Sequence, residues 1–256
     1  MTTPTEQILE KLDRIEAERN VRILYAIESG SRAWGFASPD SDYDVRFIYV
    51  RPQDEYLRLD HTDDVIEYEL NEVMDIVGWD IAKALQLFHK SNPSLFEWLG
   101  SPILYRTTPM FERLRPLLEE HYQQKFGLYH YRSMAKKNFL INFKDEQIKL
   151  KKYLYVIRPI LACKWIMKNG TPPPVLFRDL LPNVLEPDLM PAMEDLLEKK
   201  SRTAESEKQL RLALWDKWIQ ENLAMLENVA ESTELNNTMP WSRLNEAFLE
   251  ILSNAD

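Results

Sequence analysis

Residues 27–45 read IESGSRAWGFASPDSDYDV, a Gly-Ser turn followed by a run of aspartates. A β-rich run, residues 22–28, leads into the turn, and a second one, residues 43–50, leads away from the aspartates. Gly30 allows the backbone to approach a ligand closely, and the amides and hydroxyl at Ser31 suit phosphate oxygens. We therefore expect a strand, a phosphate-binding turn and a second strand, in that order.

The aspartates at the start of the second strand are the candidate metal ligands. Asp42 and Asp44 are two residues apart, so on a strand their carboxylates project from one face. Adjacent carboxylates repel one another unless a cation lies between them, and Mg²⁺ prefers one or two protein carboxylates together with substrate phosphates. An isolated Asp-x-Asp pair is as typical of an acidic turn as of a metal site. The Gly-Ser turn, Gly35 and the flanking strands favour the metal site, for Mg²⁺ or Mn²⁺.

Hydrophobic periodicity predicts the α+β class, with strands and helices in domain 1–105 and an all-helical domain 106–256. The proline-rich segment 171–182 is expected to be extended and ordered. Strands are expected at 22–28, 43–50, 63–70 and 72–79. Helices are expected at 5–19, 80–90, 95–100, 109–121, 127–144, 146–169, 188–200, 202–230 and 240–253.

The net charge of −9 is unevenly distributed along the chain. Residues 1–105 carry 10 Lys and Arg against 20 Asp and Glu, whereas residues 106–160 carry 12 against 5. An acidic part can hold cations and a basic belt can hold a polyanion, but charge alone favours ordinary solvated surfaces or docking of the belt on the acidic part. The residues of this basic belt that suit phosphates and bases are Tyr131, Arg132, Lys136, Lys137, Lys144, Lys149, Lys151, Lys152 and Arg158.

Two groups of motifs carry a resemblance to a known family. The segment GSRAWGFASPDSDYDVRF, residues 30–47, resembles the signature of the DNA polymerase beta nucleotidyltransferase superfamily. Further motifs resemble a subfamily of predicted nucleotidyltransferases associated with RNA repair pathways, and with them the resemblance covers roughly residues 20–180. They are Gly78-Trp79-Asp80, Lys83-Ala84-Leu85, Ser91-Asn92-Pro93, Glu97-Trp98, Ser101-Pro102, Tyr131 with Met134-Ala135-Lys136-Lys137, and Lys151-Lys152-Tyr153-Leu154-Tyr155 with Arg158-Pro159.

The resemblance implies a polymerase-beta-like nucleotidyltransferase domain at 1–105, with a mixed sheet and flanking helices, and a helical substrate-binding domain at 106–256. It also implies a division of roles among the site residues. Gly30 and Ser31 would hold a nucleoside triphosphate, while Asp42 and Asp44 would bind two magnesium ions. A third carboxylate on a neighbouring strand would complete the metal site. Asp75 ranks first because Met74 and Ile76 beside it can face the core. The other candidates are Asp80, which also suits a helix N-cap, and Glu67 and Glu69. Further phosphate contacts are expected from Arg32, Lys136 and Lys152.

The implied reaction transfers a nucleoside monophosphate from an NTP to an acceptor hydroxyl and releases pyrophosphate. RNA is the favoured acceptor. A hydroxyl on a partner protein is an alternative acceptor, and a nucleotide or RNA sensor that lost turnover is the alternative of another class. The residues name neither the nucleotide nor the oligomeric state.

The cysteine content and the distribution of apolar residues exclude several classes of protein. Cys163 is the single cysteine, which excludes an internal disulfide and a cysteine-built zinc site. The N-terminus lacks a basic segment followed by an apolar one, and no run of about 18 apolar residues occurs. We therefore expect a protein of the reducing cytoplasm with no membrane partner.

Overall fold

The computed structural model describes residues 2–38, 40–60, 62–70, 73–202, 207–227, 229, 233 and 240–254. By their contacts the residues form two compact units. The sheet unit comprises the described parts of Met1–Ala33, Asp42–His121 and Asn237–Asp256, and the helical unit those of Trp34–Ser41 and Tyr122–Asn236. The fold class is α+β, as the sequence predicts. The predicted boundary after residue 105 differs from this division because residues 106–121, 34–41 and the last helix follow their packing partners rather than chain order.

The sheet unit is built on a mixed five-stranded sheet with strand order β3-β4-β2-β1-β5. β2 pairs in parallel with β4, and the other neighbours are antiparallel. This arrangement places the Asp-x-Asp strand between β1 and β4, at the centre of the sheet. The strands are β1 (Arg22–Glu28), β2 (Tyr43–Val50), β3 (Val65–Leu70), β4 (Met74–Asp80) and β5 (Leu104–Thr107).

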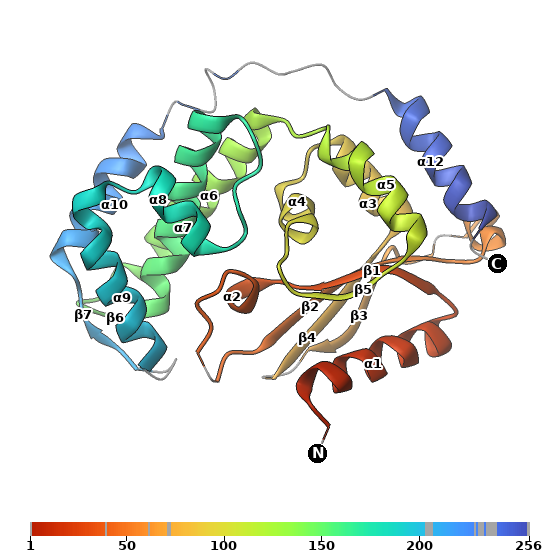
Figure 1. Ribbon diagram of the computed structural model, residues 1–256, viewed down its shortest axis with the longest axis horizontal. Helices are drawn as coiled ribbons and strands as arrows, with labels where there is room; N and C mark the ends of the chain where they lie inside the picture. The colour runs from red at the N-terminus through yellow and green to blue at the C-terminus, as the bar shows by residue number, and fades with distance from the viewer. Residues whose placement is uncertain are drawn as a thin grey trace. The chain divides into compact units, whose positions relative to one another are not determined.

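Helices cover both faces of this sheet (Figure 1). Helix α1 (Pro4–Arg19) begins with a capping box at Thr3 and buries Ile8, Leu12 and Ile15 against the sheet. The opposite face is covered by α3 (Ile81–His89), α4 (Pro93–Leu99) and α5 (Pro109–Glu119). The remaining elements of the unit are α2 (Gly30–Ala33), the 3₁₀ turn η1 (Gln53–Leu57) and α12 (Trp241–Ser253), which packs on α3.

The helical unit is organised around α7 (Leu150–Asn169), most of whose side chains are buried. It packs along α6 (Gln124–Asn142) and contacts α8, α9 and α10. The other elements of the unit are α8 (Phe177–Val184), η2 (Pro187–Leu189), α9 (Met190–Arg202), α10 (Ala213–Met225) and the short pair β6 (Gln147–Ile148) with β7 (Gln209–Leu210). None of the helices described is both long and apolar enough to cross a membrane.

Three local predictions were wrong. Segment 171–182 is not extended throughout, because α8 begins at Phe177 and buries Phe177, Leu180 and Leu181 in spite of Pro182 within it. The helix expected over 202–230 is interrupted, because residues 207–212 are not helical and include β7, and the helix α10 begins only at Ala213. Residues 203–206, 228 and 230 lie outside the described residues. The strands β5, β6 and β7 were not predicted, because short strands have too few residues for a period of two to show.

Candidate functional site

Asp44 and Asp75 lie side by side on neighbouring strands. They are partners in the parallel register of β2 and β4. The next pair in that register, Val45 and Ile76, is buried in the core beneath α1. Since side chains alternate along a strand, Asp44 and Asp75 project from the opposite face of the sheet. The predicted neighbouring strand therefore brings its carboxylate to the Asp-x-Asp strand.

Arg46 supplies the positive charge between these two carboxylates. Its Nη2 lies 2.7 Å from Asp75 Oδ2 and 3.4 Å from Asp44 Oδ1, and its Nη1 donates to the Asp75 carbonyl at 2.9 Å. Asp75 Oδ1 is buried and has no hydrogen-bond partner among the described residues. A buried carboxylate oxygen without a donor is costly, so this atom is suited to accept a ligand.

The backbone of Asp44 is held from both sides. Its amide donates to Glu28 Oε1 at 2.9 Å, and its carbonyl accepts from the Ser29 amide at 2.7 Å. Glu28 is fully buried, and its Oε2 accepts from the Tyr105 hydroxyl at 2.5 Å. Gly30 has φ +60°, and a Cβ there would lie 1.9 Å from Asp44 Oδ2. Glycine is thus required both by the left-handed backbone and by the adjoining carboxylate.

Burial and neighbouring charge affect the protonation of these acids. Burial, reinforced by the charges of Asp42 and Asp75, raises the pKa of Asp44 to about 6, although Arg46 opposes the shift. Burial also raises the pKa of Glu28, while hydrogen bonds from Tyr105 and the Asp44 amide lower it. A cation at Asp44 would remove the repulsion that helps to keep its proton on.

Asp42 lies just outside the strand on which it was expected. β2 begins at Tyr43, and Asp42 is exposed. Arg32 Nε donates to the Asp42 carbonyl at 2.9 Å, and the Arg32 guanidinium lies 3.8 Å from the centroid of the Tyr43 ring. Asp42 is close enough to affect the pKa of Asp44. The Asp42 side chain is therefore near the pair, although Asp42 precedes the strand by one residue.

The other candidates for the third carboxylate lie elsewhere. Asp80 caps α3, accepting from the Ala82 amide at 2.7 Å through Oδ1 and from the Tyr56 hydroxyl at 2.9 Å through Oδ2. Glu69 pairs with Lys11 on α1, on the face away from Asp44. Glu67 lies on the edge strand β3, opposite Val77. Of the four candidates, Asp75 is the one in register with Asp44.

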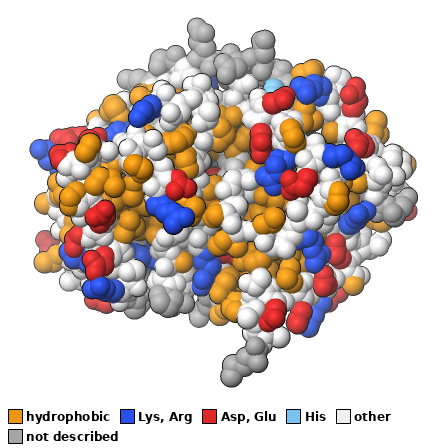
Figure 2. Space-filling view, in the orientation of Figure 1, with side chains coloured by type: hydrophobic (Ala, Val, Ile, Leu, Met, Phe, Trp, Pro, Cys, Tyr) orange, Lys and Arg blue, Asp and Glu red, His pale blue; other side chains and the backbone are white. Residues whose placement is uncertain are grey.

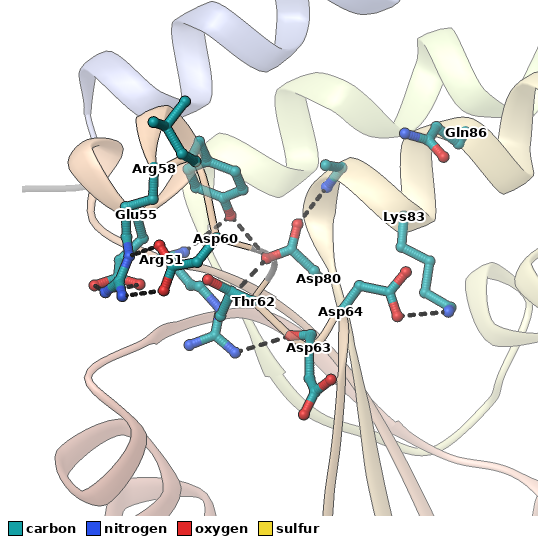
Figure 3. A pocket seen from close by; sticks show the side chains of 13 residues that line it. Arg51, Glu55, Arg58, Asp60, Thr62, Asp63, Asp64, Asp80, Lys83 and Gln86 are labelled. Carbon is teal, nitrogen blue, oxygen red and sulfur yellow. Dashed lines mark hydrogen bonds and ion pairs between the residues drawn. The ribbon is translucent and has the colours of Figure 1, made fainter.

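A pocket of the sheet unit lies at the other end of β2 (Figure 3). Arg51, which lines it, is seven residues beyond Asp44, about 23 Å along an extended strand. The pocket is polar, and its cations are paired with acids: Lys83 with Asp64 at 2.8 Å and Arg58 with Asp60 at 2.5 Å. Lys83 therefore pairs with Asp64 and not with Asp80, the residue three positions before it.

The basic belt divides into surface and core residues. Lys136 on α6 is exposed and lies 3.4 Å from Glu227, and Lys152 on α7 lies 5.5 Å from the Tyr155 ring centroid. Tyr131 and Arg158 are buried, so they cannot form part of an exposed basic surface. On the face seen in Figure 2, acidic and basic side chains are intermixed over each unit.

Glu28, Arg46 and Tyr105 were missed in the sequence. Arg46 could have been found, because it follows Asp44 by two residues on a strand and must share its face. Tyr105 could not, because β5 carries no clear pattern. Glu28 could have been suspected as an acid that directly follows the apolar run of residues 23–27.

The donor set at Asp44 and Asp75 fits a magnesium ion. Within the described ranges no three His, Cys, Asp or Glu residues form a ready-made metal cluster. Mg²⁺ is usually bound by only one or two carboxylates, with water and substrate phosphates completing its shell. The oxygen chemistry and the unpartnered Asp75 Oδ1 meet that requirement.

Comparisons with known proteins agree with the sequence motifs. A protein of Bacillus subtilis (strain 168), the uncharacterized protein YcgL, is 43% identical over 246 residues, 95% of each chain. A crystal structure of a nucleotidyltransferase-like protein from Exiguobacterium sibiricum 255-15 is 11% identical, with 97% of this chain and 81% of that one covered and a TM-score of 0.31, too low to bear on the fold. A model of the RNA repair pathway DNA polymerase beta family matches residues 5–250. The chain therefore belongs to the RNA repair pathway DNA polymerase beta family.

Proposed function

We propose that the protein is a metal-dependent nucleotidyltransferase that transfers a nucleoside monophosphate from an NTP to an acceptor hydroxyl. Family membership supports this class of reaction. The observation that carries the proposal is the in-register pair Asp44 and Asp75, with an unpartnered oxygen on Asp75. Two carboxylates that share one guanidinium carry an excess negative charge, which can bind a cation.

Asp44 and Asp75 would hold Mg²⁺ or Mn²⁺, with Asp42 beside them. When bound, the metal supplies positive charge that stabilises the attacking and leaving oxygens of an in-line displacement. Gly30 provides room for the carboxylate of Asp44, and the backbone at Gly30 and Ser31 would bind the triphosphate. Arg32, Lys136 and Lys152 are the proposed additional phosphate contacts.

In the reaction the acceptor oxygen forms a bond to the α-phosphorus, and the bond from that phosphorus to the bridging oxygen breaks. Pyrophosphate leaves with the electrons of that bond. The proton of the acceptor hydroxyl passes to the Asp75 carboxylate, which lies beside the proposed metal position. Arg46 donates to Oδ2 of Asp75 and so orients that carboxylate.

RNA is the proposed acceptor, on the strength of the family description. Transfer to a protein hydroxyl or nucleotide binding without transfer would replace this assignment. Lys136 and Lys137 would contribute to RNA affinity as phosphate contacts. Replacing both with Gln should weaken RNA binding and reduce the salt slope by about 0.7 to 0.9 per lost contact.

The test is incubation with each labelled NTP, Mg²⁺ or Mn²⁺, and a pool of small RNAs. We expect label in RNA and release of pyrophosphate by the wild-type protein. Asp44→Asn and Asp75→Asn should abolish incorporation, whereas Asp64→Asn, in the distant pocket, should not. Incorporation that persists in both site variants would exclude this site. Label on protein alone would identify a protein acceptor, and binding without any transfer would identify a sensor.

A further inference from the structure

The segment Trp34–Ser41 joins the Gly-Ser turn to Asp42 but belongs to the helical unit. We call it the strap; its described residues are 34–38, 40 and 41. Ala33 and Asp42, which flank it, belong to the sheet unit. The chain therefore leaves the sheet unit between the two halves of its motif and returns at the first candidate ligand.

The first anchor of the strap is Trp34. The guanidinium of Arg158 lies 4.4 Å from the centroid of its ring, and Arg158 is only 1% exposed. The Trp34 carbonyl accepts from the Phe177 amide at 2.9 Å. A buried Arg on an aromatic face is a strong, oriented contact. The start of the strap is thus fixed by α7 and α8.

Lys200 of α9 is the second anchor. It is 4% exposed, and its Nζ donates to the Phe36 carbonyl at 2.6 Å and to Ser38 Oγ at 2.9 Å. The Phe36 ring lies edge-on to Phe177 at 5.6 Å. The ammonium group therefore bonds both the backbone and a side chain of the strap.

A hydrogen-bonded turn continues this anchor to the end of the strap. The Ser38 amide donates to Ser41 Oγ at 3.0 Å, the Ser41 amide donates to the Ser38 carbonyl at 3.1 Å, and the two hydroxyls lie 3.3 Å apart. Both serines are buried. The network from Lys200 through Ser38 thus ends one residue before Asp42.

Burying an ammonium group is unfavourable, and an apolar side chain of similar volume would fill the space at a lower cost in stability. A lysine at this position is explained by the hydrogen bonds that it donates to the strap, which orient the backbone there. We propose that Lys200 is a positioning residue: by holding the strap, it fixes the backbone of Asp42 and thereby the metal and nucleotide site. This inference rests on the proposed function.

The experiment compares three variants of the full chain with the wild type. Lys200→Met keeps the volume and removes the donor, Ser41→Ala removes the last link and leaves the cation, and Lys199→Met is the matched control on the exposed side of α9. Amide hydrogen exchange is followed by mass spectrometry in peptides covering residues 34–44, and Mn²⁺ affinity is measured by calorimetry. Transfer kinetics give kcat and KM for the NTP.

We expect exchange over residues 34–44 to rise by about tenfold or more in Lys200→Met and by less in Ser41→Ala, as a local opening free energy falls. Mn²⁺ affinity and kcat should fall in the same order, with a smaller change in KM. Lys200→Arg should restore part of each, and Lys199→Met should match the wild type.

Unchanged exchange in both Lys200→Met and Ser41→Ala would overturn the inference. So would faster exchange with unchanged Mn²⁺ affinity, because the strap would then have only a structural role. If Lys200→Met does not fold, Ser41→Ala alone decides between these outcomes. A wild-type protein that binds Mn²⁺ but transfers nothing would sink the proposed function and leave the inference to be judged on exchange and affinity. If the wild type does not bind Mn²⁺ at all, both the metal site and the role of Lys200 in it are rejected.

Discussion

The two ends of the β2–β4 pair place aspartates in opposite circumstances. At one end Asp44 and Asp75 share a single guanidinium, and Asp75 Oδ1 has no partner in the described structure. At the other end both oxygens of Asp80 accept hydrogen bonds, from the Ala82 amide and the Tyr56 hydroxyl. A fully bonded carboxylate explains local structure, whereas one left partly unbonded at a cost in stability indicates a ligand.

The largest effect that separates the two ends should come from Asp75→Asn. The amide keeps the shape of the side chain but cannot take the hydroxyl proton or supply a charged ligand. We expect the transfer rate to fall by about 10³-fold or more, roughly 4 kcal/mol of transition-state stabilisation. Single-turnover transfer measures the rate, and circular dichroism checks that the fold is retained.

Asp80→Asn is the matched control at the opposite end. Its side-chain carbonyl can still cap α3, so folded protein should transfer at close to the wild-type rate. A large loss in Asp80→Asn with little change in Asp75→Asn would reverse the assignment of the third carboxylate.

Gly30→Ala should give the second largest effect. A methyl group there would lie 1.9 Å from Asp44 Oδ2, on a backbone with φ +60°, so the carboxylate must move. We expect about a 10²-fold loss of transfer, because misplacement by about 1 Å is enough for that. Gly100, which ends α4 with φ −90°, is the control, and its Ala variant should transfer normally. Equal activity in the two variants would show that Asp44 need not be held where it is.

Much of this end of the sheet is readable from local sequence. The β-rich runs at 22–28 and 43–50 have the observed bounds of β1 and β2, and Asp75 ranks first because Met74 and Ile76 beside it can face the core. Asp42 lies one residue before the second of these strands, which begins at Tyr43. Strand pattern thus identifies which residues share a face, but strand ends depend on pairing partners.

The features of the fold and site that the sequence does not predict depend on contacts between residues far apart in the chain. The register that pairs Asp44 with Asp75 joins strands separated by η1 and β3. Nothing in the local sequence of α9 distinguishes buried Lys200 from exposed Lys199, because both lie in the same charged run. α8 is not evident from the sequence because the three prolines before it favour an extended chain, although Phe177 and Leu180 form a buried apolar face.

The third largest effect should come from Asp80→Ala, and it should appear in the stability of the protein rather than in catalysis. Asp80→Ala removes the N-cap of α3 and leaves the half-buried Tyr56 hydroxyl without its acceptor. We expect the free energy of unfolding to fall by about 1–3 kcal/mol. Urea denaturation of the purified variant measures this change. Asp64→Ala, which removes only an exposed pair with Lys83, should cost less than about 1 kcal/mol, and an equal cost in both variants would contradict the contrast drawn for Asp80.

The smallest effect is a pH dependence specific to Asp44. Burial raises its pKa from 3.8 to about 6, so the folded state binds the proton more tightly than the unfolded state does. Stability from this group is therefore present below about pH 4 and is lost as the pH rises through about 6. In the metal-free protein Asp44→Asn should gain about 1 kcal/mol relative to the wild type between pH 4 and 7.5, a value discounted for partial exposure and for the lost Arg46 contact. Urea unfolding in chelator at each pH measures the difference. Above pH 6, Mg²⁺ should reverse the sign of this difference by stabilising only the wild type. A difference in unfolding free energy that does not change with pH would mean that burial does not raise the pKa of Asp44.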